Sequence, residues 1–312
     1  MKKLLSMLVM ASMMVFALGT MGASAAAKAP KNDKAVVVVS FGSTFDDTRT
    51  KDIGGIEEAV AKAFPNRDFK RAFTSYIIME RLEKNKGIKV NDLPATLKEL
   101  KKAGYKDILV QPTHLLHGEE YEHKVLTTVD KFKGDFDRIV VSDPLMVGKN
   151  DFAIAASAVA TQFPTLGKGE GVVLMGHGSP RDNNQSFGNT YKMLQETFDK
   201  MGLPVVVGTV EEVDTPNVDE VLEQIKARGY KTVHMFPLMI VAGDHANNDM
   251  YGDEEDSWKS MIEKMGVKTV GHLQGIGRNA AVQAIYVQHA VAAEAGAQRS
   301  EEHTSELQSP FY

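Results

Sequence analysis

No cysteine occurs anywhere in the 312-residue sequence. Its absence excludes disulfide bonds, thiolate metal sites, cysteine nucleophiles and a lipoprotein anchor. The chain also lacks an excess of basic residues: its formal net charge is -5 at pH 7, which argues against a nucleic-acid partner. The remaining composition is that of an ordinary globular protein, 43% hydrophobic and 25% charged, with enough residues for two domains.

A hydrophobic run long enough to span a membrane is missing as well. The apolar run Leu4–Gly19 is shorter than the ~20 residues of a spanning helix, although a membrane anchor is the alternative interpretation. A basic start, Met1–Lys3, precedes the run, and Ala23–Ala25 follows it with a small-x-small cleavage pattern. We therefore predict a signal peptide over residues 1–26, cleavage near Ala25–Ala27 and a periplasmic product without membrane insertion.

The other end of the chain differs in character from the rest. Residues 299–312 are polar and read like a translated sequencing adapter. We expect this tail to be an artefact rather than part of the native product. His303, which lies in it, is therefore left out of the site arguments.

Between these ends, apolar strand-like runs alternate with helical patterns. Such continuous apolar strands are typical of a parallel sheet that is covered on both faces. The glycine- and lysine-containing stretch 165–171 predicts a boundary between an N-terminal α/β lobe, 34–165, and a C-terminal α/β lobe, 166–298. The expected strands are Ala35–Val39, Ile108–Val110, Gly171–Met175 and Val205–Val207. The expected helices cover residues 53–63, 96–103, 150–163 and 191–201.

The two halves resemble copies of each other. Residues 35–43 (AVVVVSFGS) match residues 171–179 (GVVLMGHGS). A glycine, a proline and a second glycine recur at identical spacing, at positions 104, 112 and 118 and at positions 229, 237 and 243. This repetition indicates a duplication, and hence two α/β lobes of like topology facing each other across a cleft. In such sheets ligands bind beyond the carboxyl ends of the strands.

The copies differ at two positions that follow strands. Phe41 in the first half corresponds to His177 in the second, and Glu120 corresponds to His245. A scaffold position that holds Phe in one copy and His in the other is not set by folding alone. Glu211 follows the strand Val205–Val207 in the same lobe as both histidines.

Two imidazoles and a carboxylate suit a first-row divalent ion and leave coordination positions open. We therefore predict a metal site at His177, Glu211 and His245, with Glu120 facing it as a proton acceptor. Each residue also has an ordinary interpretation. His177 could be a turn histidine, His245 a neighbour of an Asp244 helix cap, and Glu211 a solvated side chain.

The segment His114–His123 contains the densest cluster of titratable side chains. His114 ends a strand, and its ordinary interpretation is a buried histidine with satisfied hydrogen bonds. His123 or His117 is a candidate axial ligand for a b-type haem, because no cysteine is present to hold haem covalently. The alternative for His123 is a solvated histidine on a helix.

The same motifs resemble a known family, the anaerobic sirohydrochlorin cobaltochelatases, which are ATP-independent class II chelatases related to ferrochelatase. The resemblance covers about residues 35–296, and its most specific parts are Met175–Gly178 and Pro237–His245. It implies two flavodoxin-like lobes with a tetrapyrrole between them. It also implies that His177, Glu211 and His245 hold the metal. Further matching stretches are 40–43, 71–75, 118–121, 208–211, 248–250 and 256–259.

The resemblance implies that the protein inserts Co²⁺ into sirohydrochlorin, and Fe²⁺ is a second candidate ion. We also expect the protein to form a homo-oligomer. The carboxylates of the macrocycle need donors, which helix N-termini after Ser43 and Ser179 could supply. Arg71 and Arg181 are candidate clamps for these carboxylates. Two features depart from the family: the export signal, since its usual members are cytoplasmic, and His123, where relatives commonly carry lysine.

Two other functions compete with a chelatase. One is an exported protein that carries a metal, a tetrapyrrole or haem without turnover. The other is a periplasmic solute-binding protein, which is also bilobal and exported. The histidines of the GHGS and GDH segments argue against a transport receptor, which has no need for them.

Overall fold

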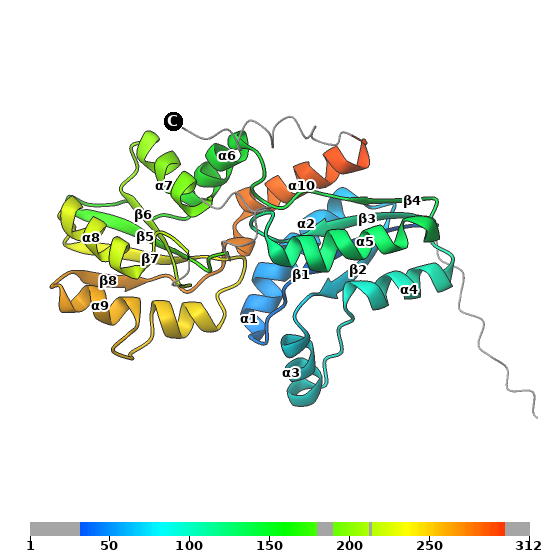
Figure 1. Ribbon diagram of the computed structural model, residues 1–312, viewed down its shortest axis with the longest axis horizontal. Helices are drawn as coiled ribbons and strands as arrows, with labels where there is room; N and C mark the ends of the chain where they lie inside the picture. Colours follow the sequence, from blue (N-terminus) through cyan, green and yellow to red (C-terminus); the bar gives the residue numbers. More distant parts are fainter. Residues whose placement is uncertain (1–31, 180–189, 212–213, 297–312) are drawn as a thin grey trace, which may run out of the picture.

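Two four-stranded parallel sheets form the framework of the computed structural model, which describes residues 32–179, 190–211 and 214–296 (Figure 1). Their strand orders are β2-β1-β3-β4 and β6-β5-β7-β8, so both have the same topology. This repetition agrees with the duplication seen in the sequence. The strands are β1 (Lys34–Ser40), β2 (Asp68–Phe73), β3 (Asp107–Pro112), β4 (Arg138–Val141), β5 (Glu170–Gly176), β6 (Val205–Thr209), β7 (Thr232–Leu238) and β8 (Lys268–Gly271).

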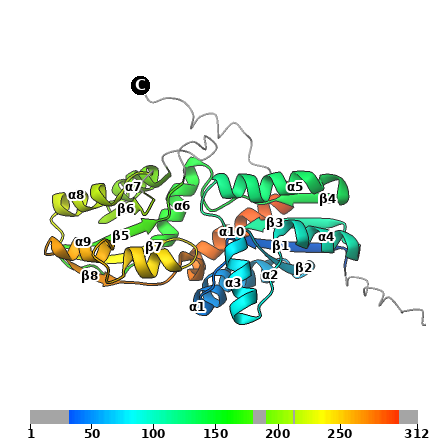
Figure 2. The same cartoon turned by 60° about the horizontal axis from the view of Figure 1, so that its bottom comes forward.

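Helices connect the strands and cover the sheets (Figure 2). In the first half they are α1 (Asp46–Thr48), η1 (Arg49–Ile53), α2 (Gly54–Ala63), α3 (Tyr76–Lys86), α4 (Leu93–Ala103), η2 (Tyr121–Leu126), α5 (Thr127–Phe132), η3 (Lys133–Asp135) and α6 (Lys149–Ala160). In the second half they are α7 (Thr190–Lys200), α8 (Val218–Arg228), η4 (Ala246–Met250), α9 (Trp258–Lys264), η5 (Ile276–Arg278) and α10 (Ala280–Glu294).

The central strand of each sheet is buried on both faces. In β1 the residues Ala35 to Val39 are completely inaccessible to solvent. Val36 and Val38 belong to one apolar cluster, and Val37 and Val39 belong to another on the opposite face. A run of β-branched residues without polar alternation is therefore what this strand requires.

The helices do not divide between the lobes in the same way as the strands. α10 lies in the range expected for the second lobe, yet it packs against α2, β3 and β4 of the first (Figures 1 and 2). α6 precedes the second sheet and packs against both α7 and α10. One apolar cluster consequently contains residues of both sheets, including Val36 and Val172. This shared core joins the two halves and fixes the strand ends that face each other.

No helix within the described ranges is long and apolar enough to cross a membrane. The predicted signal peptide, residues 1–26, and the suspected artefactual tail, residues 299–312, lie outside the described residues.

Candidate active site between the two sheets

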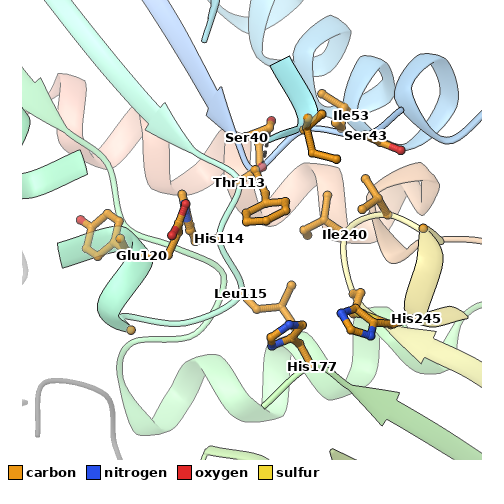
Figure 3. A pocket seen from close by; sticks show the side chains of 18 of the residues that line it. Ser40, Ser43, Ile53, Thr113, His114, Leu115, Glu120, His177, Ile240 and His245 are labelled. Carbon is orange, nitrogen blue, oxygen red and sulfur yellow. Dashed lines mark hydrogen bonds between the residues drawn. The ribbon is translucent and has the colours of Figure 1, made fainter. Parts of the chain in front are cut away.

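A cavity of about 590 Å³ lies between the carboxyl ends of the two sheets (Figure 3). Most of its lining comes from the segments that follow β1 and β3 in the first half and β5 and β7 in the second, and η1, α3 and α7 add further residues. The volume is within the range typical of small-molecule sites. The cavity therefore lies where the duplication predicted a cleft.

His177 and His245 come together on the second-lobe side of this cavity (Figure 3). Their ring centroids are 4.9 Å apart, in an edge-to-face arrangement. His177 follows β5 and His245 follows β7, two strands that pair along their whole length. The parallel pairing of these strands therefore places the two imidazoles next to each other, as the sequence predicted.

Hydrogen bonds orient both rings in the same sense. The Nδ1 atom of His245 lies 2.6 Å from a carboxylate oxygen of Asp249, one helical turn further on. The Nδ1 atom of His177 lies 3.2 Å from the carbonyl oxygen of Gly178. Because both partners can only accept, the neutral form of each ring that makes these bonds carries its proton on Nδ1 and keeps the Nε2 lone pair for a metal ion.

Glu211 approaches only one of these rings. Its Oε1 atom is 3.7 Å from Nε2 of His177, and its backbone N–H donates to the carbonyl of His177. Gly178, with a φ of +102°, permits this approach because a Cβ atom there would lie 2.9 Å from Cβ of Glu211. Within the described ranges, no group of three or more His, Asp or Glu side chains is placed to hold one metal ion. The structure therefore brings the two histidines together. That Glu211 is the third ligand of the metal ion stays a prediction.

Glu120 lines the cavity from the first lobe, immediately before η2. Figure 3 shows it on a different side of the cavity from His177 and His245. This placement agrees with its correspondence to His245 in the duplication. A carboxylate there can accept a proton from a molecule that fills the space between the lobes.

His114 is a cavity residue for which the sequence suggested the wrong environment. Both of its ring nitrogens are buried, and neither has a hydrogen-bond partner in the described structure. Its backbone carbonyl accepts a hydrogen bond of 3.0 Å from the hydroxyl of Tyr286 in α10. Burial lowers the pKa of the imidazole from 6.5 to about 4. The expected core histidine with satisfied hydrogen bonds is instead a neutral, unpaired imidazole beside the cavity.

This burial predicts an acid-sensitive contribution to stability. The folded chain keeps His114 neutral down to about pH 4, whereas the unfolded chain takes up the proton near pH 6.5. Below pH 6.5 protons therefore bind preferentially to the unfolded state, and stability falls with pH. Between pH 6.5 and pH 4 the free energy of unfolding should fall by roughly 2–3 kcal/mol through this group. Urea denaturation of metal-free protein at several pH values measures the slope. His114→Gln should show a shallower slope, and an identical slope in both proteins contradicts the prediction.

The predicted substrate-binding residues have different environments. Ser43 and Ser179 both line the cavity. The Ser43 hydroxyl accepts a hydrogen bond from the backbone N–H of Phe45, and the Ser179 N–H donates to a carboxylate oxygen of Asp214. The Ser179 N–H is thus already engaged within the protein. Arg181 lies outside the described residues.

Arg71 does not line the cavity. Its guanidinium donates to both carboxylate oxygens of Glu57 on α2, with a Nε–Oε1 distance of 2.6 Å. Glu57 is buried, so this ion pair holds β2 against α2. The structure therefore corrects the expectation of a substrate clamp at Arg71.

The two candidate haem ligands also differ from each other. His123 is exposed and lines the cavity. His117 is bound through Nε2 to Glu122 at 2.5 Å, and its ring packs edge-on against Tyr121. Haem binding at either residue stays a prediction, which purified protein without a Soret band after haem addition would refute.

A family model described as cobalt chelatase (CbiK) matches residues 34–294. The chain belongs to this family. The chain is 37% identical over 256 residues to the sirohydrochlorin cobaltochelatase of Salmonella typhimurium. The alignment covers 82% of this chain and 94% of the relative. The chain is 29% identical to the sirohydrochlorin cobaltochelatase CbiKC of Nitratidesulfovibrio vulgaris, covering 85% and 92% of the two chains.

Solved structures show the same fold. The sirohydrochlorin chelatase SirB from Bacillus subtilis subspecies spizizenii, in complex with cobalt, aligns with a TM-score of 0.52 at 17% identity, covering 84% of this chain and 95% of SirB. SirB from Bacillus subtilis with Fe³⁺ aligns with a TM-score of 0.51 at 18% identity, covering 89% and 99%. The CbiK-family chain therefore has the class II chelatase fold, which confirms the predicted fold class.

Proposed function

We propose that this chain is a sirohydrochlorin cobaltochelatase, which inserts Co²⁺ into the macrocycle between its lobes without ATP. The observation that best supports this function is the histidine pair. The Nε2 atoms of both imidazoles are free at one side of the cavity, and Glu120 lies on another side. The relatives of known activity that are 37% and 29% identical support the same reaction. Fe²⁺ is a second candidate ion.

The reaction exchanges one divalent ion for two pyrrole protons. The ion must lose water before it enters the ring, and neutral imidazoles hold it loosely enough to pass it on. Each of the two pyrrole nitrogens that bind the ion first loses its N–H proton. Glu120 is the proposed acceptor for these protons, which it then releases to solvent.

A spectroscopic assay tests the proposal. Purified protein, sirohydrochlorin and Co²⁺ are mixed without ATP, and the ultraviolet–visible spectrum is followed as the ion enters the ring. Insertion faster than the protein-free rate supports the chelatase. Binding of the macrocycle or the ion without such acceleration would instead indicate a carrier protein.

Replacing Glu120 with glutamine should lower kcat by about 100-fold while metal affinity stays within about twofold of wild type. Glutamine keeps the shape of the side chain but cannot accept the pyrrole proton. Steady-state insertion rates and calorimetric titration with Co²⁺ measure the two effects separately. Glu99→Gln, an exposed change on α4, is the matched control. A Glu120→Gln protein with the wild-type kcat would remove Glu120 from the mechanism.

We also propose export to the periplasm and assembly into a homo-oligomer. The basic start, the apolar run and the Ala23–Ala25 pattern support export. Fractionation with N-terminal sequencing tests it, because a full-length cytoplasmic product excludes cleavage. Sedimentation of the mature protein tests oligomerisation.

A further inference from the structure

The charges that line the cavity are divided unevenly. Among the described lining residues the permanent cations are Arg81 on α3 and Lys124 on η2, and both belong to the first lobe. The first lobe also contributes the carboxylates of Glu119 and Glu120, and the second lobe contributes His177, His245 and the acidic Asp244. A polycarboxylate in this cavity would therefore find its permanent positive charge on one side only.

Two other cations of the first lobe near these elements are already neutralised. Arg71 pairs with Glu57, and Lys86 pairs with Asp46 at 2.8 Å. Within the described part of the chain, no ion pair forms at Arg81 or Lys124. These two side chains are therefore available to an anionic ligand.

Both cations adjoin α3 (Tyr76–Lys86), although they belong to different elements. The ammonium of Lys124 lies 4.8 Å from the centroid of the Tyr76 ring, at the first residue of α3. Arg81 lies on α3 itself, five residues after Tyr76. Positive charge therefore gathers at this helix, on the first-lobe side of the cavity.

An apolar surface in the same cavity complements these charges. Phe41 and Phe45 line it, although 53% and 41% of their surfaces remain exposed. Exposed phenyl rings offer a flat macrocycle a stacking face. Phe41 also occupies the position that corresponds to His177 in the duplication.

We propose that Arg81 and Lys124 anchor rim carboxylates of the tetrapyrrole and so orient its ring nitrogens towards His177 and His245. This inference rests on the proposed function, since sirohydrochlorin carries acetate and propionate groups around its rim. The anchors contribute binding and orientation, and they take no part in proton transfer.

Equilibrium binding of metal-free sirohydrochlorin tests the anchors without requiring turnover. We expect Arg81→Gln and Lys124→Gln each to raise Kd about three- to tenfold in a fluorescence titration. The double variant should raise it further and should lose much of the salt dependence of binding, because fewer charge pairs remain to be screened. Arg81→Lys and Lys124→Arg should recover most of the affinity.

Two comparisons keep the result interpretable. Lys98→Gln, an exposed change on α4, should leave Kd at the wild-type value. Calorimetric Co²⁺ affinity should stay unchanged in all variants, because the histidine pair is intact. If the wild type binds sirohydrochlorin but never inserts cobalt, the proposed function fails while the anchors can still be measured. If both Gln variants and their double bind sirohydrochlorin as wild type does, with the same salt dependence, the anchors are wrong.

Discussion

Replacing His177 or His245 with alanine should reduce cobalt insertion at least ~100-fold, while the protein remains folded. Each imidazole offers its Nε2 atom at the same side of the cavity, so either change removes one of two paired metal ligands. The two side chains are 50% and 40% exposed, and truncation therefore opens no hole in the apolar core. Calorimetric Co²⁺ affinity and the insertion rate should fall together, and the circular dichroism spectrum should not change.

A graded variant separates ligand loss from a disturbed loop. Asp249→Asn keeps a side chain of the same shape but removes the carboxylate that orients His245, so affinity should fall by about 10–100-fold. The order of effects should be wild type, then Asp249→Asn, then His245→Ala. If both alanine variants keep wild-type affinity and rate, the site assignment is wrong and the proposed chelatase loses its mechanism.

The internal duplication explains why the sequence predicted this part of the site. The residues that follow paired parallel strands lie at one edge of the sheet, so the sequence predicts that His177 and His245 are neighbours. Asp249 was not predicted, although its spacing of four residues from His245 on a helix was a usable signal. The unpaired nitrogens of His114 could not be predicted, because hydrogen-bond satisfaction depends on neighbours from distant segments.

Long-range packing was the part of the fold that sequence patterns left open. A helical pattern predicts α6 and its length but carries no information about which sheet the helix covers. α10 is apolar around much of its circumference and returns to the first sheet, where Tyr286 bonds the segment after β3. The pairing of Arg71 with Glu57 has the same origin, since a strand and a helix 14 residues apart come together only in the folded chain.

Replacing Asp52 with alanine should cause the largest loss of stability among simple changes near the site. Asp52 lies on η1 of the first half, and its side chain is completely buried. It accepts hydrogen bonds from Arg278 and from two backbone N–H groups of the second half, those of Ala242 at 3.3 Å and Gly275 at 3.2 Å. One carboxylate therefore ties three points of the second half to the first.

The cost of removing this carboxylate follows from its burial. Burial raises the pKa of Asp52 above its ordinary value, even though Arg278 lies against it. Its loss would leave Nε of Arg278 and two backbone donors without an acceptor, a change that costs about 3–5 kcal/mol. For a chain of this size the melting temperature should fall by roughly 5–10 °C. Asp52→Asn keeps one acceptor and the shape of the side chain, so its loss should be smaller.

Asp52→Ala should also affect the predicted metal site, because Asp52 bonds the backbone next to His245. Ala242 precedes the Gly243–Asp244–His245 segment, and its carbonyl also accepts a hydrogen bond from Thr48. Releasing its N–H should loosen the position of His245 and lower Co²⁺ affinity in Asp52→Ala, although both histidines remain. Asp47→Ala is the matched control, because Asp47 pairs with the same Arg278 from α1, which directly precedes η1, but is exposed. In calorimetry the melting temperature of Asp47→Ala should be close to that of wild type, and that of Asp52→Ala should be well below it. Equal melting temperatures for all three proteins would show that Asp52 does not join the lobes.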